Sequence, residues 1–267
     1  MQSYKNLWYI CRMKASNGII KIISSLDKVK NRRDTGLFVA EGTKCVLDLM
    51  CGFEPRYIVA TEQWLGQNGD ALSGLNPEAV FTASPKDMGR MSNLSTPSGV
   101  IGVFVLPQRD AVSPDVADKE LVLILDDVRD PGNLGTIIRA ADWFGIRHIV
   151  CSKESVDAFN PKVVMATMGA LARVEVDYVE LDGWLSRFNG PCYGTFLDGE
   201  TIYDAKLEQH GVIVVGNEGR GVSPTVASKC THRLFIPPYP SDAVTSESLN
   251  VGMATSIVLN EFRRRNG

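Results

Sequence analysis

Closely spaced metal ligands and paired cysteines are missing from this sequence. Its six cysteines include no CxxC pair, and its three histidines are far apart. Structural zinc sites need Cys and His ligands at short spacings, and disulfide frameworks occur mainly in small secreted chains. We therefore expect no metal site, and we expect the cysteines to be buried or idle thiols.

Long apolar runs are also missing. No segment approaches the roughly 18 consecutive apolar residues of a membrane-spanning helix. The first residues, MQSYKNLWYICRMK, are interrupted by polar and basic side chains and do not resemble a secretory signal. We expect no membrane partner and a cytoplasmic location.

The chain has no overall excess of positive charge, but its charge is unevenly distributed. The net charge of −3 argues against indiscriminate binding to nucleic acid. Residues 1–106 have 12 basic and 9 acidic residues, and residues 1–33 have eight basic residues against Asp27 alone. The basic residues of this segment are Lys5, Arg12, Lys14, Lys21, Lys28, Lys30, Arg32 and Arg33. The segment is either a polyanion-facing surface or a solvated helix face, and charge alone does not separate the two.

The first third of the chain has the pattern of a small α/β unit. Period-2 and apolar runs predict strands at 37–42, 56–61, 79–84 and 99–106, and helical periodicity predicts helices at 17–34 and 43–52. Residues 107–119 contain prolines and aspartates with little apolar content, which indicates a linker. We therefore predict an RNA-binding domain at 1–106, a linker at 107–119 and a second domain at 120–267.

From Leu121 onward, strands and helices alternate. Strands are predicted at 121–128, 148–152, 192–198, 211–216 and 232–237, and helices at 134–145, 160–174 and 248–265. This alternation is typical of an α/β fold with a mostly parallel sheet and helices on both faces. Ligands of such sheets bind at the carboxyl ends of the strands, so the loops after the strands are the candidate sites.

The loop GNEGRG, residues 216–221, fits neither common phosphate-binding pattern. It lacks the GK[ST] end of a Walker loop, and its glycine order is GxxGxG where a Rossmann loop has GxGxxG. Glu218 would repel an anion, so the loop favours a ligand with hydroxyls, amines or a positive charge. The alternative is a glycine turn with a solvated glutamate.

Polar side chains mark two further loops. Asn133 and Arg139 lie at the start and in the second turn of a predicted helix whose other residues are mainly apolar. An unpaired guanidinium is costly in such surroundings, so Arg139 either forms an internal ion pair or reaches a site. Ser248 and Asn250 precede the last predicted helix, where a capping role explains one of them but not both.

These loops, in this order, resemble the three motifs of the SpoU family of RNA ribose 2′-O-methyltransferases, the TrmH-like branch of the knotted SPOUT superfamily. The matching segments are NLGTIIRAADWFG, VVGNEGRGVS and IPPYP followed by ESLNVGMATSIVLNEF. The resemblance covers about 150 residues from Leu121. LFVAEGTKCVLDLM and LSTPSGVIGVF also resemble the family's ribosomal-protein-like substrate-binding domain.

The resemblance implies a trefoil-knotted C-terminal domain that uses S-adenosylmethionine. Arg139 matches the family's catalytic arginine, which would stabilise the developing alkoxide. The residues expected to orient it and the ribose are Asn133, Glu218, Ser248 and Asn250. The expected cofactor contacts are Thr195, Leu197, Gly199, Gly216, Asn217, Ile236 and Leu249. The connection 238–246 is longer than is usual in the family, which leaves the shape of the pocket open.

The family also implies partners. Its members form homodimers through the C-terminal helix, although the small and apolar face of that helix is also suited to packing within its own domain. The N-terminal domain favours ribosomal RNA over transfer RNA as the substrate. A non-catalytic RNA-binding protein of ribosome assembly is the rival from another class. A Rossmann-type nucleotide enzyme is disfavoured because no GxGxxG follows a first strand.

Overall fold

The structure is a computed structural model, and it describes residues 13–240, 246 and 248–264. Lys5, Arg12 and residues 241–245 of the long connection lie outside the described residues. The chain divides into two compact units. The N-terminal unit comprises Met1–Gln108 and Phe159–Ala172, and the C-terminal unit comprises Arg109–Ala158 and Arg173–Gly267.

The N-terminal unit is built on a four-stranded mixed sheet with the order β1-β4-β2-β3. Strand β4 is antiparallel to both β1 and β2, whereas β2 and β3 are parallel. The strands are β1 (Leu37–Glu41), β2 (Pro55–Ala60), β3 (Val80–Thr82) and β4 (Val100–Val105). The helices are α1 (Asn17–Ser25), α2 (Val29–Thr35), α3 (Thr43–Leu49), α4 (Glu62–Asn68), η2 (Gly69–Leu72), η3 (Pro77–Ala79), α5 (Pro85–Met91), α7 (Pro161–Thr167) and η5 (Ala170–Ala172). The predicted strands are all present, whereas α4 and α5 were not predicted.

The predicted helix at 17–34 is two helices in the structure. Helix α1 buries Ile20 and Ile23 in the core of the N-terminal unit, and Leu26 is buried where the chain turns. Arg32 of α2 is only 2% exposed and donates hydrogen bonds to the carbonyls of Leu26 and Asp27 at 2.8 and 2.9 Å. Arg32 therefore stabilises the break between the helices, and it is wrong to count it among the basic surface residues.

The C-terminal unit confirms the predicted α/β fold. Its six strands form one parallel sheet with the order β10-β8-β9-β5-β6-β7. The strands are β5 (Leu121–Leu125), β6 (His148–Ser152), β7 (Glu175–Val179), β8 (Cys192–Thr201), β9 (Gly211–Val215) and β10 (His232–Phe235). The helices are η4 (Pro114–Asp118), α6 (Pro131–Trp143), α8 (Leu181–Leu185), α9 (Pro224–Ala227) and α10 (Val251–Arg264).

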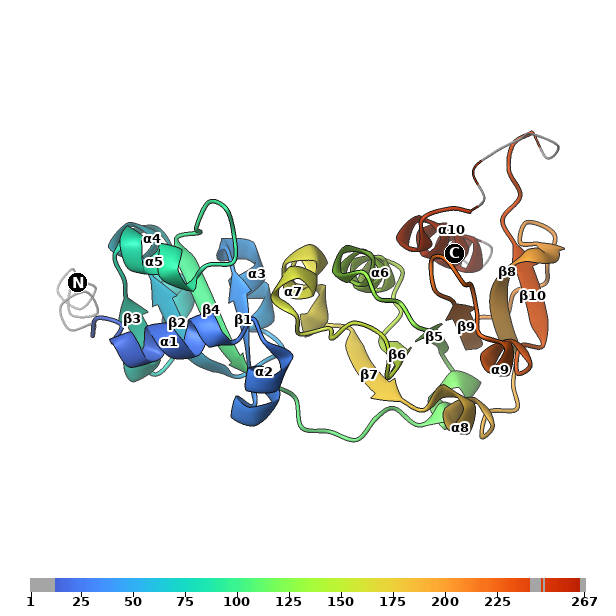
Figure 1. Ribbon diagram of the computed structural model, residues 1–267, viewed down its shortest axis with the longest axis horizontal. Coiled ribbons are helices and arrows are strands. Elements are labelled where there is room, and N and C mark those ends of the chain that lie inside the picture. The colour runs from blue at the N-terminus through green and yellow to red at the C-terminus, as the bar shows by residue number, and fades with distance from the viewer. Residues whose placement is uncertain (1–12, 241–245, 247, 265–267) are drawn as a thin grey trace. The chain divides into compact units, whose positions relative to one another are not determined.

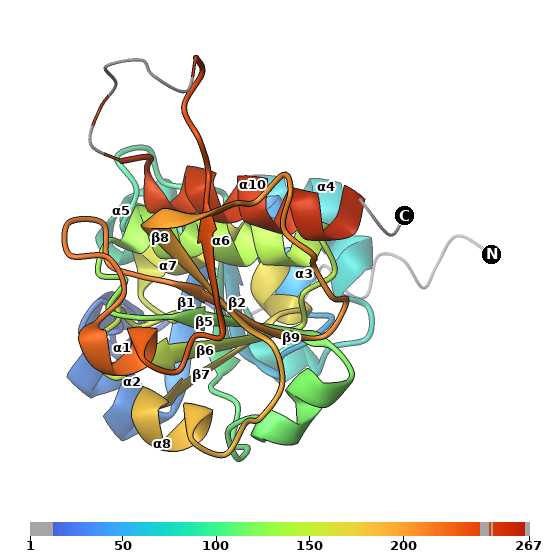
Figure 2. The same cartoon turned by 90° about the vertical axis from the view of Figure 1, so that its right-hand side faces the viewer.

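Helices cover both faces of this parallel sheet. Helices α6 and α10 lie against one face and α8 and α9 against the other, as both views show (Figures 1 and 2). The central strands β5 and β9 are buried along their whole length because side chains on both of their faces meet a helix layer. This explains why their sequences are continuous apolar runs.

The structure corrects several predicted element boundaries. The helix predicted at 160–174 ends at Thr167, because Met168 and Gly169 have φ angles of 53° and 92°. Strand β7 and helix α8 were not predicted. The linker residues from Arg109 onward pack with the C-terminal unit, since Arg109 pairs with Asp177 at 3.0 Å.

Candidate active site

The predicted site loops meet at one edge of the parallel sheet. Strands β10, β8, β9 and β5 lie in this order in the sheet, and the three candidate loops follow β5, β9 and β10. The loop after β5 leads into α6, and the loop after β9 is GNEGRG. Because parallel strands end at the same edge, the sheet topology brings these loops together.

A chain of hydrogen bonds joins the three motif segments. The Nδ2 group of Asn133 donates to Oε1 of Glu218 at 2.8 Å, and Nδ2 of Asn250 donates to Oδ1 of Asn133 at 2.8 Å. Asn133 and Glu218 are half-buried, whereas Asn250 is exposed. Three of the five residues expected to act on the substrate are thus in direct contact in one network.

Helix termini position both asparagines of this network. Asp130 caps α6 by accepting a hydrogen bond from the backbone N–H of Asn133 at 2.8 Å, and Pro131 provides the first helical residue. Oδ1 of Asn250 accepts from the N–H groups of Gly252 and Met253 at 3.0 and 3.2 Å. Asn250 therefore caps α10 with its oxygen while its nitrogen contacts Asn133, so one side chain has both roles.

Arg139 does not have the apolar surroundings that its sequence context suggested. It is exposed on α6, and no hydrogen bond or ion pair involves its side chain within the described part of the chain. The alternative of an internal ion pair with a described carboxylate is therefore wrong. Arg139 is six residues beyond Asn133, about 9 Å along the helix axis, and its guanidinium is open to a ligand.

The GNEGRG loop is a tight turn that Asn217 holds together. Backbone hydrogen bonds run in both directions between Asn217 and Gly221, and Oδ1 of Asn217 accepts from the N–H groups of Gly219 and Arg220 at 3.0 and 3.1 Å. A Cβ atom on Gly216 would lie 2.2 Å from the backbone carbon of Gly221. Only glycine at position 216 allows the two arms of the turn to approach so closely.

The loop after β5 contains two acidic residues that the sequence analysis missed. Asp126 is 6% exposed and accepts from the N–H of Ser223 at 2.7 Å. Asp127 has a φ angle of 62° and pairs with both Arg129 and Arg220. The paired carboxylate raises the pKa of the Arg129 guanidinium above its ordinary value. The Asp-Asp dipeptide directly after a buried strand was the available sequence signal.

Further contacts fasten this loop to the glycine turn. The Nδ2 group of Asn217 donates to the carbonyl of Asp127 at 2.8 Å. Together with the Asp127 to Arg220 pair, this bond joins the loop after β5 to the glycine turn.

Thr195, Leu197 and Gly199, the expected cofactor contacts on β8, lie where the strand departs from its regular pairing with β10. Its pairing with β10 passes from Gly194 opposite Arg233 directly to Glu200 opposite Leu234, so residues 195–199 leave the ladder. Leu197 is 70% exposed at the tip. A Cβ atom on Gly199 would lie 2.4 Å from the carbonyl oxygen of Arg233. This irregular segment therefore exposes the apolar side chain of Leu197, while Gly199 at its end packs closely against β10.

The remaining expected residues are less closely tied to the network. Thr195 donates a hydrogen bond to the carbonyl of Val214 at 3.2 Å, and Ile236 is half-buried just beyond β10. Leu249 is 48% exposed immediately before Asn250. Ser248 is exposed, and among the described residues its side chain has no hydrogen bond that joins it to Asn133 or Glu218.

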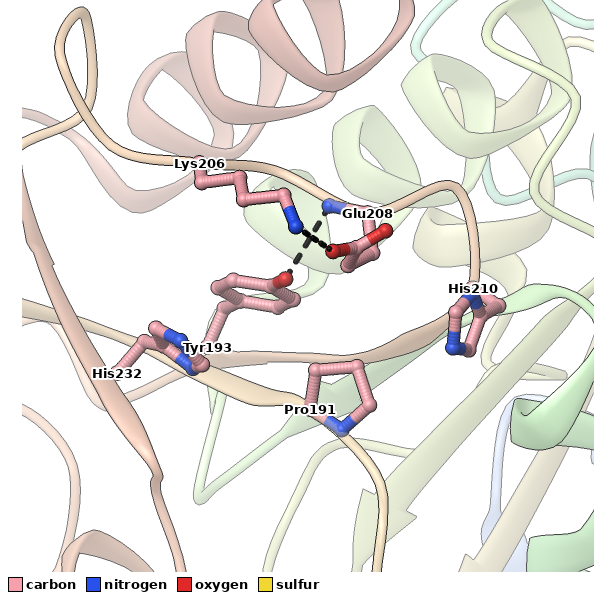
Figure 3. A pocket seen from close by; sticks show the side chains of 6 residues that line it. All are labelled: Pro191, Tyr193, Lys206, Glu208, His210 and His232. Carbon is pink, nitrogen blue, oxygen red and sulfur yellow. Dashed lines mark hydrogen bonds and ion pairs between the residues drawn. The ribbon is translucent and has the colours of Figure 1, made fainter.

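A separate hollow of about 390 Å³ lies at the opposite edge of the sheet (Figure 3). It is lined by Pro191, Tyr193, Lys206, Glu208, His210 and His232. These residues lie at or near the amino ends of β8, β9 and β10, away from the edge where parallel sheets bind ligands. Lys206 lies 3.0 Å from Glu208 and lowers the pKa of that carboxyl. We therefore place the candidate site in the motif loops.

The described residues contain neither a metal-ligand group nor a membrane-spanning helix. No group of three or more His, Cys, Asp or Glu residues there is arranged to hold a metal ion. No helix in the described ranges is long and apolar enough to cross a membrane.

Comparison with known proteins identifies the family. The SpoU rRNA Methylase family matches residues 120–260, which is more than half of the chain. The chain belongs to the SpoU rRNA methylase family. The MRM3-like substrate binding domain matches residues 17–102. The predicted membership, and the predicted N-terminal substrate-binding domain, are confirmed.

Relatives of SpoU type resemble the chain over nearly its full length. A putative RNA methyltransferase of the TrmH family from Porphyromonas gingivalis is 39% identical with a TM-score of 0.83, covering 94% of this chain and 99% of that chain. An AdoMet-bound rRNA methyltransferase from Sinorhizobium meliloti is 29% identical with a TM-score of 0.81, covering 96% and 97%. The 23S rRNA (guanosine(2553)-2′-O)-methyltransferase RlmP of Bacillus subtilis is 28% identical over 93% of this chain and 97% of its own length.

Proposed function

We propose that this protein transfers a methyl group from S-adenosylmethionine to a ribose 2′-hydroxyl of ribosomal RNA. The observation that carries the proposal is the network of Glu218, Asn133 and Asn250, which joins all three family motifs at one edge of the sheet. Similar proteins named as acting on ribosomal RNA, and the match to a substrate-binding domain, support this class of RNA. The proposed location is the cytoplasm.

The residues at this edge fit the proposed cofactor. Leu197 and Leu249 expose apolar side chains, and an adenine ring packed on them would remove that surface from water. Glu218 supplies a negative charge in the glycine loop, which suits a cationic sulfonium better than a phosphate. We propose Thr195, Leu197, Gly199, Gly216, Asn217, Ile236 and Leu249 as the cofactor contacts.

The bound cofactor would supply an electrophilic methyl group, and the protein has to align and activate the hydroxyl. Arg139 is exposed and free of partners within the described residues, so it is available to stabilise negative charge on the ribose oxygen and on a neighbouring phosphate. A guanidinium remains protonated, so Arg139 acts as a charge stabiliser and hydrogen-bond donor. Asn133, Asn250 and Glu218 position this end of the site, and Ser248 contributes a hydroxyl at its rim.

The direct test is methyl transfer from labelled S-adenosylmethionine to total ribosomal RNA and, separately, to total transfer RNA. Both pools should come from a strain that lacks the protein, so that the target position is unmodified. We expect label in ribosomal RNA, at one 2′-O-methyl nucleotide. Label in transfer RNA alone would replace the proposed substrate, and cofactor binding without label in either pool would direct the test to assembled ribosomal particles. No cofactor binding would overturn the proposal in favour of a non-catalytic RNA-binding protein.

We further propose a homodimer formed through α6 and α10. These helices pack side by side in the C-terminal unit, where a Cβ atom on Gly252 would lie 3.2 Å from Thr136. Trp143 is 85% exposed and Met253 is 59% exposed on these helices. A second copy packed on this surface would bury both side chains, and it would bring Arg139 next to the interface.

We also propose that the C-terminal unit is knotted, in accordance with its family. The parallel sheet, with β8 placed between β9 and β10, and the return of the chain to pack α10 on α6 are compatible with a threaded C-terminal segment. Pulling the chain by its two ends in a single-molecule experiment tests this. A tightened knot should leave the unfolded chain shorter than a freely extended chain of this length, whereas full extension would contradict it.

A further inference from the structure

Two cysteines lie close together in the C-terminal unit, outside the proposed site. Cys192 is the first residue of β8, and Cys230 lies just before β10, which pairs with β8 in parallel. Their sulfur atoms are 4.0 Å apart. Thr231, next to Cys230, holds the two segments together. Its N–H donates to the carbonyl of Cys192 at 2.9 Å, and its hydroxyl accepts from the N–H of Cys192 at 2.9 Å.

A glycine makes room for the second sulfur. A Cβ atom on Gly194 would lie 2.7 Å from the sulfur of Cys230, so that sulfur occupies a space that any larger residue would fill. A disulfide bond is about 2.05 Å long, so the two sulfurs need to approach by roughly 2 Å. The disulfide therefore requires a movement of the Cys230 side chain toward Cys192.

The two thiols differ in access and in acidity. Cys192 is 2% exposed, whereas Cys230 is half-buried, so a small reagent reaches Cys230 first. The hydrogen bond from the Cys192 thiol lowers the pKa of Cys230 below its ordinary value. The same contact, together with burial, raises the pKa of Cys192. Of the two thiols, Cys230 is therefore the more accessible and the more readily ionised.

We propose that Cys230 and Cys192 form a peroxide-sensitive thiol pair that closes to an intramolecular disulfide. The Cys230 thiolate attacks hydrogen peroxide, the O–O bond breaks, and a sulfenic acid and one water form after protonation. Cys192 then attacks the sulfenic sulfur, its thiol proton passes to the leaving hydroxyl, the S–O bond breaks, and a second water leaves. Two thiols are oxidised by two electrons in total, and one peroxide is reduced to two waters.

The other cysteines lack these features. Cys45 and Cys151 are buried, and burial raises the pKa of Cys45 to about 12 and that of Cys151 further. Cys51 is exposed, and no other described sulfur is hydrogen-bonded to it. Cys11 lies outside the described residues. Selective chemistry is therefore expected at the Cys192 and Cys230 pair, and this expectation does not depend on the proposed function.

The test uses full-length protein with Cys11→Ser and Cys51→Ser, treated with hydrogen peroxide. We expect an intact mass lower by about 2 Da, because two hydrogens leave when the disulfide forms. Peptide mapping should link the Cys192 and Cys230 peptides, and dithiothreitol should restore the mass. Oxidation of Cys230 to sulfinic acid without a link, a link to Cys45 or Cys151, or an intermolecular disulfide would each overturn the proposal.

Single variants separate the roles of the two thiols. Cys192→Ser should leave a sulfenic acid on Cys230 that dimedone captures, and Cys230→Ser should remove the reaction. Dimedone capture at Cys192 in the second variant would reverse the assignment and contradict the proposal. Thermal melting of each variant checks that it is folded, and the mapping of the parent protein decides the proposal even if a variant does not fold.

Discussion

Arg139 is the residue on which the proposed chemistry depends. The guanidinium is exposed and unpaired among the described residues, so its loss leaves the fold intact and removes a charge stabiliser. We expect Arg139→Ala to lower methyl transfer by roughly two or more orders of magnitude, the scale of an electrostatic stabiliser, with near-normal cofactor binding. Turnover on ribosomal RNA and calorimetry with S-adenosylmethionine measure the two effects.

A matched control for this variant is Arg187→Ala. Arg187 is also exposed but follows α8, on the other face of the sheet. Its removal changes the net charge equally and should leave turnover unchanged. Equal turnover in Arg139→Ala and the parent protein would refute the assigned role.

Asn133 connects the motif segments and gives a second prediction. Asn133→Ala removes the donor to Glu218 and the acceptor for Asn250. A hydrogen bond to a charged group contributes about 1.5–3 kcal/mol, so we expect kcat to fall on the order of ten- to a hundredfold. Asn260→Ala, an exposed asparagine on α10, is the control. A change in KM for the cofactor alone would show that Asn133 acts in binding and not in positioning.

Arg263 determines how α10 is held against the end of α6. Its guanidinium donates to the carbonyls of Phe144 and Gly145 at 2.8 and 3.2 Å and to Oε1 of Gln209 at 2.9 Å. Carbonyls at a helix C-terminus lack partners within the helix, so these bonds complete α6. Arg263→Ala should lower the free energy of unfolding by about 1–3 kcal/mol, as measured by urea denaturation.

The control for Arg263→Ala is an exposed arginine near the same end of α6. Arg147→Ala, close to the same helix end but exposed, should change the free energy of unfolding by less than about 0.5 kcal/mol. If both variants unfold at the same urea concentration as the parent protein, Arg263 does not stabilise the packing of α10.

The oligomeric state is the prediction that belongs to the whole molecule. Trp143→Glu places a charge on the exposed apolar surface of α6 and should shift the protein from dimer toward monomer at micromolar concentration. Size-exclusion chromatography with light scattering measures the mass. Leu94→Glu, an exposed apolar position in the N-terminal unit, should leave the mass unchanged. A monomeric parent protein would contradict the proposed dimer.

Some elements were predictable because their patterns are strong. The apolar runs of β5 and β9 are buried on both faces, and continuous apolar strands are typical of parallel sheets. Strand β7 was missed because its sequence, EVDYV, contains charges. Asp177 of this strand pairs with Arg109, a contact between segments 68 residues apart. A short stretch of sequence does not reveal that the charge of Asp177 is neutralised by a distant arginine.

The candidate site was also only partly predictable from the sequence. The motif pattern indicated Asn133, Glu218 and Asn250, but it could not show that they form one hydrogen-bonded line. Arg139 was singled out because the residues around it in the sequence are apolar, but the structure places it on the exposed face of α6. Asp127 was missed because its role depends on a φ angle of 62° and on arginines in two loops.

The sequence by itself determined the family and the parallel α/β class and indicated candidate site residues, because motif spacing and apolar periodicity are local properties of the chain. Only the tertiary structure decided which of those residues touch, that Arg32 is buried and Arg139 exposed, and that Cys192 lies 4.0 Å from Cys230. The contacts of Asn133 with Glu218 and Asn250, and of Cys192 with Cys230, join segments far apart in the chain. They depend on the order of strands in the sheet, which no local pattern encodes.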